Sequence, residues 1–164
     1  MPLGKTLRLY LSDGSPTGPI VAEIINWTGQ VIVVPRPQLH EMAKREELQR
    51  TGIFILVGPD AQTSADRIYV GEADDVFDRL KTHAKDDTKD FWTRAVTITS
   101  KDFNLTKAHG RYLEGRLIEL GQICRPFNGF QWHKPRAEDA PRVRRGRHGV
   151  LFGSDQTNAS SAGL

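Results

Sequence analysis

Three side chains have the chemistry to act on a phosphate group, and two of them are spaced to act together. Arg79 and His83 lie four residues apart, which places both on one face of a helix. The planar guanidinium of Arg79 matches phosphate oxygens, and the imidazole of His83 can bind a phosphate or pass a proton. Glu114 offers a carboxylate to Mg²⁺, an ion that keeps several waters and needs few protein ligands. Together, these residue types suit metal-assisted hydrolysis of a phosphodiester.

Small and basic residues surround the candidate metal ligand. Gly110 precedes Glu114 by one helical turn, and Gly115 follows it directly. Because glycine has no side chain, both positions leave room for an ion and a nucleic-acid backbone. Lys107 and Arg111 are candidate substrate-binding residues, since they add positive charge that either contacts phosphates or is simply solvated.

Apolar periodicity predicts the elements that must position these residues. Strands are predicted at 52–57, 68–71 and 95–99, the last rich in β-branched residues. One helix is predicted from an Asp74 cap to His83, and a second from an Asn104 cap to Gly121. We therefore expect an α/β (α+β) fold with a small mixed or antiparallel sheet flanked by helices.

The chain before residue 51 has the pattern of two strand–helix pairs. Strands are predicted at 7–11 and 31–34, and helices at 21–25 and 38–50, with Gly29 ending the first helix. We expect residues 1–50 to form an N-terminal strand–helix extension and residues 51–130 to form the domain that carries the site. Residues 131–164 are rich in Arg, Pro, Gly and small polar residues, which predicts a disordered basic tail.

The charge of the chain is unevenly distributed. The formal net charge is +3 over 164 residues, but residues 125–164 carry seven basic and three acidic residues. The remaining 124 residues are therefore nearly neutral, with a net charge of −1. This balance excludes a protamine-like polycation, and a nucleic-acid partner has to be argued from local residues instead.

Cysteine content and apolar runs bear on the compartment. The single cysteine, Cys124, cannot form an internal disulfide, and the first residues lack the apolar stretch of a signal peptide. The apolar runs at 31–34 and 53–57 are far shorter than the ~20 residues that span a bilayer. We expect a cytoplasmic protein without a membrane partner.

The order of the motifs is more specific than any one of them. Gly52-Ile53-Phe54 and Tyr69-Val70-Gly71 are two strand triplets, followed by Arg79, His83, Glu114 and finally Asn128. This ordered set, over residues 51–128, resembles the GIY-YIG nuclease superfamily, which includes homing endonucleases and some restriction enzymes. The resemblance implies a DNA endonuclease, with RNA as a further possible substrate.

The resemblance also implies a role for each matching residue. Glu114 would bind one divalent ion, Mg²⁺ or Mn²⁺, on the side of the leaving group. Arg79 would steady the scissile phosphate, and Tyr69 would orient or deprotonate the attacking water. His83 and Asn128 would support the site.

Phe54 departs from the pattern, because the family usually has tyrosine at the end of the first triplet. Phenylalanine has no proton to exchange, so a non-catalytic nucleic-acid-binding module and a protein-interaction domain are the alternatives. Each residue also has an ordinary interpretation. Arg79 could pair with Asp75, His83 could complement a helix end, Glu114 could lie on a solvated face, and Asn128 could form a turn.

Overall fold

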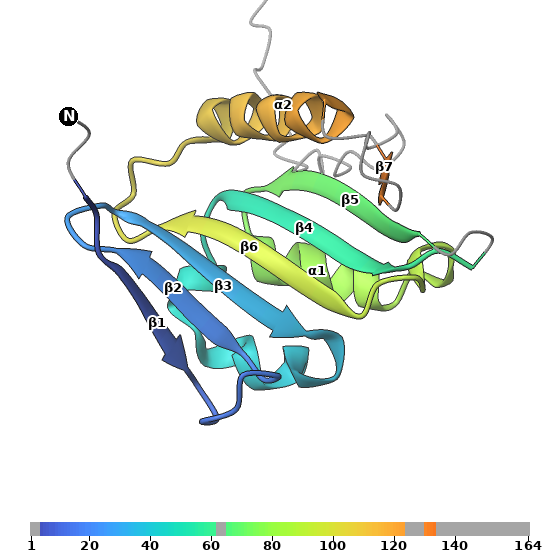
Figure 1. Ribbon diagram of the computed structural model, residues 1–164, viewed down its shortest axis with the longest axis horizontal. Coiled ribbons are helices and arrows are strands. Elements are labelled where there is room, and N and C mark those ends of the chain that lie inside the picture. The colour runs from blue at the N-terminus through green and yellow to red at the C-terminus, as the bar shows by residue number, and fades with distance from the viewer. Residues whose placement is uncertain (1–3, 62–64, 124–129, 134–164) are drawn as a thin grey trace, which may run out of the picture.

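One seven-stranded sheet runs through the computed structural model, which describes residues 4–61, 65–123 and 130–133 (Figure 1). The strand order is β1-β2-β3-β6-β4-β5-β7. Neighbouring strands are antiparallel, except that β7 runs parallel to β5. The strands are β1 (Leu7–Leu11), β2 (Ile20–Ile24), β3 (Gly29–Pro35), β4 (Gly52–Pro59), β5 (Asp66–Ala73), β6 (Arg94–Ser100) and β7 (Phe130–His133).

Two α-helices and three 3₁₀ segments complete the described elements. The helices are α1 (Val76–Ala84) and α2 (Lys107–Ile123), and the 3₁₀ segments are η1 (Arg36–Lys44), η2 (Glu46–Leu48) and η3 (Asp87–Lys89). Neither α1 nor α2 is long and apolar enough to cross a membrane. The predicted α/β class, with an antiparallel sheet flanked by helices, is confirmed.

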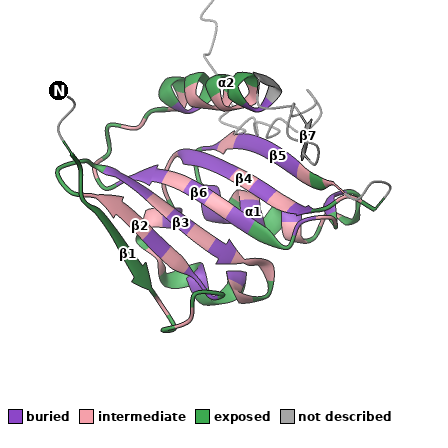
Figure 2. Ribbon diagram, in the orientation of Figure 1, coloured by how far each residue is buried: buried purple, intermediate pink, exposed green. Residues whose placement is uncertain are grey.

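Alternate residues of β4 belong to two separate cores, one on each face of the sheet. Figure 2 shows that most of this strand is buried. Phe54 and Leu56 pack with α1, η1 and η2, on what we call the α1 face. Ile53, Ile55 and Val57 pack with apolar residues of α2, on the α2 face. Since strand side chains alternate with a period of two, consecutive residues of the triplets lie on opposite faces.

The predicted helix at 21–25 is wrong: residues 20–24 form β2. Ile20 and Ala22 pair with Val33 and Val31 across an antiparallel ladder, and Asn26, with a φ of 63°, makes the turn between the strands. The apolar spacing is too short to distinguish a helix turn from a strand, and pairing with the β-branched β3 favours the strand. Gly29, predicted to end the helix, instead begins β3.

β1, β2 and β3, from the predicted N-terminal extension, belong to the same sheet as the strands of the predicted site domain. β3 pairs with β6 over seven positions, from Gly29 opposite Ser100 to Pro35 opposite Arg94. The helix predicted at 38–50 consists of η1 and η2, which bury Leu39, Met42 and Leu48 against the α1 face. β7 extends the sheet into residues 131–133, which were predicted to lie in the tail.

Local side chains set where the two helices begin. Asp75, not the predicted Asp74, caps α1, and its carboxylate accepts a hydrogen bond of 2.8 Å from the main-chain N–H of Asp78. The Thr106 hydroxyl, not the predicted Asn104 side chain, accepts a hydrogen bond from the N–H of His109 at the start of α2. α2 also continues to Ile123, beyond the predicted end at Gly121.

Candidate nucleic-acid-processing site

Tyr69 and His83 lie inside the core of the α1 face. Their side chains are 4% and 1% exposed, respectively. Their rings lie 5.4 Å apart between centroids, and both contact the ring of Phe54, at 6.1 Å from Tyr69 and 5.2 Å from His83. The Lys89 ammonium lies 4.7 Å from the centre of the Tyr69 ring. These residues form an aromatic cluster that joins β4 and β5 to α1.

Glu114 lies on the opposite side of the sheet. It is half-buried on α2, and its neighbours Leu113 and Leu117 pack against the α2 face at Ile68 and Val70. Tyr69 lies between those two residues in β5 and therefore points away from α2. The structure does not bring Tyr69 and His83 together with Glu114, because the sheet lies between them.

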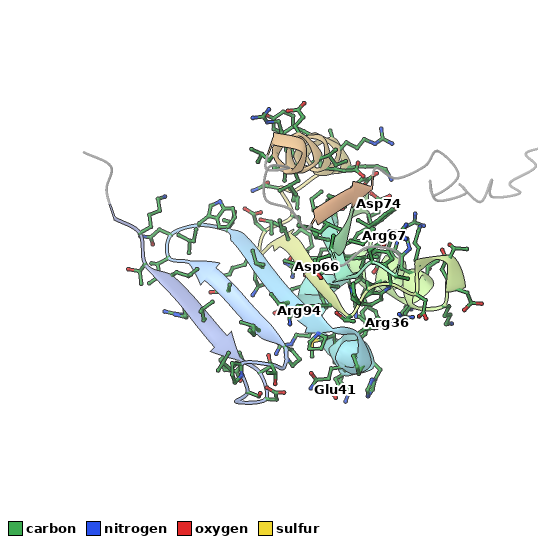
Figure 3. All side chains as sticks on the ribbon, turned by 45° about the vertical axis from the view of Figure 1, so that its right-hand side comes forward. Arg36, Glu41, Asp66, Arg67, Asp74 and Arg94 are labelled. Atoms are coloured by element: carbon green, nitrogen blue, oxygen red, sulfur yellow. The ribbon has the colours of Figure 1, made fainter. Side chains whose placement is uncertain are left out.

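A groove at the end of β5 brings Arg79 and Lys107 together. It has a volume of about 240 Å³ and lies between the start of α1 and the start of α2. The Lys107 ammonium pairs with the Asp74 carboxylate at 2.6 Å, near the end of β5 and beneath α2 (Figure 3). We call it the β5-end groove; its lining residues are Glu72, Ala73, Asp74, Asp75, Asp78, Arg79, Thr82 and Lys107.

Glu72 is a residue of this groove that the sequence reasoning missed. Its side chain is 14% exposed, and Arg111 approaches carboxylate oxygen Oε1 at 3.7 Å. The other oxygen, Oε2, is buried and accepts no hydrogen bond from the residues that the structure describes. A Cβ added to Gly110 would lie 3.9 Å from this oxygen. Gly110 therefore lies beside a buried carboxylate oxygen that still has bonding capacity.

The position of Glu72 follows a signal present in the sequence. Ile68, Val70 and Glu72 alternate along β5, so all three face α2. Glu114 lies one helical turn after Gly110 on the same side of α2. A carboxylate that continues an apolar alternation and faces a glycine on a helix is a pattern that could have identified Glu72.

The charges of the β5-end groove favour a cation over a bare anion. Its lining includes four carboxylates and two basic side chains. Within the described ranges, no group of three or more His, Cys, Asp or Glu residues is arranged to hold a metal ion. Mg²⁺ binds in many sites through one or two carboxylates, its remaining ligands being water or phosphate oxygens. Glu72 lines the groove and offers carboxylate oxygens of this kind, whereas Glu114 is not among the residues that line it.

A polar turn connects β6 to α2. The Asp102 carboxylate accepts hydrogen bonds from the Ser100 hydroxyl at 2.6 Å and from the Asn104 side-chain amide at 2.8 Å. These hydrogen bonds lower the pKa of Asp102, with the Ser100 hydroxyl making the largest contribution. The ionised carboxylate therefore stabilises the turn from which α2 starts.

The remaining predicted residues have different surroundings. Arg111 is exposed on α2 and lies near Glu72, whereas Phe54 is 1% exposed in the aromatic cluster. Asn128 lies outside the described residues. Comparisons with family models, with curated proteins and with solved structures found no match to this chain.

Proposed function

We propose that this protein is a divalent-metal-dependent endonuclease that hydrolyses phosphodiester bonds of DNA. The observation that carries the proposal is the β5-end groove, where Arg79 and Lys107 from two different helices lie beside the carboxylate of Glu72. Arg79 would bind the non-bridging oxygens of the scissile phosphate, for which its planar fork is suited. Lys107 would neutralise a neighbouring phosphate.

One Mg²⁺ or Mn²⁺ ion would be held by Glu114, with Glu72 as a second oxygen ligand. When bound, such an ion ionises water and stabilises the negative charge of the reacting phosphate. The excess of carboxylates in the groove repels a bare phosphate, so DNA binding there should itself depend on the divalent cation. RNA, which presents the same phosphates, is a possible second substrate.

Tyr69 and His83 act as positioning residues in this proposal. Both are buried in the aromatic cluster, and His83 lies one turn after Arg79 on α1. Packing of the two rings against Phe54 holds α1 against β5 and so sets the place from which Arg79 extends. Removing either ring should weaken cleavage through the position of Arg79.

The experiment is a cleavage assay with Mg²⁺ on duplex, branched and single-stranded DNA. Arg79→Ala and Glu114→Gln should each lower the rate by about 100-fold or more, since each removes a charge that acts on the reacting phosphate. Arg116→Ala is the matched control, because Arg116 is exposed on α2 and pairs with the exposed Glu119 of the same helix. A wild-type protein that cuts none of these substrates, or a fully active Glu114→Gln variant, would refute the proposal.

Two glycines of α2 allow a test that separates the site from the fold. A Cβ at Gly110 would occupy the space beside Glu72, whereas one at Gly115 would meet nothing within 4 Å. Both Gly→Ala changes should stabilise α2, each by about 1 kcal/mol, because alanine is the better helix former. Only Gly110→Ala should also reduce cleavage and raise the Mg²⁺ concentration needed. Equal activity of the two variants would place the ion elsewhere.

A nucleic-acid-binding module without catalysis is the second candidate, and Phe54 favours it. Phe54 carries no hydroxyl and is 1% exposed, so it can neither exchange a proton nor reach a substrate. This candidate predicts binding of DNA in EDTA that equals binding in Mg²⁺, with no cleavage in either. The nuclease proposal predicts binding that strengthens with the cation.

A further inference from the structure

Half of the α2 face is covered by no described helix. The pairing register places nine aliphatic side chains of β1, β2, β3 and β6 on this face, in line with the residues that α2 covers. Leu7 and Leu9 of β1 are 58% and 60% exposed. We call this surface the open apolar face; its residues are Leu7, Leu9, Leu11, Ile20, Ala22, Ile24, Val31, Val33 and Val96.

α2 forms a wall along one side of the open apolar face. The helix packs on β4 and β5, as Figures 1 and 3 show, and leaves β1 to β3 bare. Leu113 lines a mainly apolar groove of about 210 Å³ together with Trp27 and Ile98. Leu120, two turns after Leu113 and thus on the same side of α2, is 49% exposed. A second layer placed on the bare strands would therefore contact apolar residues below and beside it.

β1 is also an edge strand of the sheet. Its inner side pairs with β2, and its outer side pairs with no strand among the described residues. Exposed apolar edge strands are hazards that proteins usually cover or charge. β1 exposes apolar side chains on both of its faces, such as Leu9 on one and Tyr10 on the other.

We propose that the open apolar face is the interface of a twofold dimer of this chain. The two copies would stack β1 to β3 face to face, and α2 of each copy would lie beside the β1 edge of the other. The proposal does not rest on the nuclease function.

Charge and layer thickness argue for a second copy as the occupant. A twofold interface must be complementary to itself, and a patch of nine aliphatic side chains meets this requirement without repulsion. Arg94 of β6, which pairs in register with Val57, is a charged residue that continues the row of Val96 on the α2 face. Stacked sheets lie about 10 Å apart, and a helix is about 10–12 Å across. The partner's sheet would thus occupy the same layer as α2.

The area of the open apolar face limits the affinity that we expect for the dimer. Four strands about 4.8 Å apart and five residues long give a flat footprint of about 320 Å². Trp27 and the exposed side of α2 add to it, yet the total stays at or below the ~800 Å² per partner of a standard interface. We therefore expect reversible association in the micromolar range.

The experiment is sedimentation velocity of the full chain from low to high micromolar concentration. Wild type should shift from a species of 18.4 kDa toward twice that mass as concentration rises. Leu9→Asp should raise the dissociation constant at least tenfold, because each dimer would bury two copies of the new charge. Tyr10→Asp is the matched control: it changes the same strand at 58% exposure but faces the other side of the sheet. Thermal unfolding verifies that both variants fold.

Three outcomes would overturn the dimer. One is a wild-type protein that stays monomeric at every concentration. Another is a dimer that Leu9→Asp and Tyr10→Asp weaken equally, which would place the interface elsewhere on β1. The third is a monomeric wild-type protein that binds no apolar dye, together with a Leu9→Asp variant that binds it. That result would show that another segment of the same chain covers the open apolar face in wild type.

Discussion

Replacing Phe54 with tyrosine tests whether the first triplet still has room for the hydroxyl that the family pattern expects. The ring is 1% exposed and packs against Tyr69 and His83. Its Cζ atom, which would carry the new hydroxyl, points at Gly71, where an added Cβ would approach it to 2.5 Å. The backbone of β5 therefore occupies the place that the hydroxyl needs.

The cost of Phe54→Tyr follows from two effects. Inserting a group into a packed core costs about 1–3 kcal/mol. A buried hydroxyl without a hydrogen-bond partner adds about 1–3 kcal/mol. Partial relaxation reduces the sum, so we expect a loss of about 2–4 kcal/mol in the free energy of unfolding. With a denaturant slope of about 2 kcal/mol per molar urea, the unfolding midpoint should fall by about 1–2 M.

Equilibrium unfolding in urea, followed by tryptophan fluorescence and far-UV circular dichroism, measures this change. Phe103→Tyr is the control, since Phe103 is 86% exposed and its new hydroxyl would lie in water. We expect its midpoint to match wild type. An equally stable Phe54→Tyr variant would refute the packing argument, and a variant that also cut DNA faster would show that the missing hydroxyl limits the reaction.

Three further predictions concern the scaffold. Gly58→Ala should lower the free energy of unfolding by about 3–5 kcal/mol. The new Cβ would collide with the Phe91 carbonyl oxygen and lie 2.7 Å from Trp92 Cα, and neither backbone atom can move aside. A soluble variant with an unchanged urea midpoint would contradict this. Arg36→Lys should lower the free energy of unfolding, measured in urea, by about 1–3 kcal/mol. The Arg36 guanidinium donates to three main-chain carbonyls, and a single ammonium cannot replace it. A lysine variant as stable as wild type would show that the positive charge alone suffices. Asp102→Asn should lower the thermal midpoint by more at pH 7 than at pH 3, because the lowered pKa of Asp102 contributes stability above about pH 4 that is lost as the pH falls through the folded-state pKa. An equal difference from wild type at both pH values would exclude this cause.

The sequence predicted the middle of the fold more accurately than its beginning. The strands at 52–57, 68–71 and 95–99 and both helices are present, because long apolar patterns act locally. The helix predicted at 21–25 failed because a few apolar residues suit either a helix turn or a strand. β2 exists because β1 and β3 lie on either side of it, which is information from distant parts of the chain.

The candidate site was predicted in part. Residue types and order singled out Arg79, Lys107 and Glu114, but they could not show that Tyr69 points to the other face of the sheet from Glu114. Glu72 was missed although it continues the alternation of Ile68 and Val70, because the predicted strand ended at residue 71 and the position of Gly110 over Glu72 is a tertiary contact. Glu72 and Gly110 are 38 positions apart in the sequence, and their proximity depends on how α2 docks on the sheet.

The sequence by itself determined the α/β class, most strands and both helices, since backbone preferences and apolar periodicity operate over a few residues. It also suggested residues whose types suit phosphate chemistry, which stays a prediction. The tertiary structure alone decided that β1 to β3 join the same sheet, that the sheet divides the candidate residues, and that no described helix covers half of one face. These outcomes depend on strand pairing and helix docking, whose energies come from contacts between residues far apart in the chain.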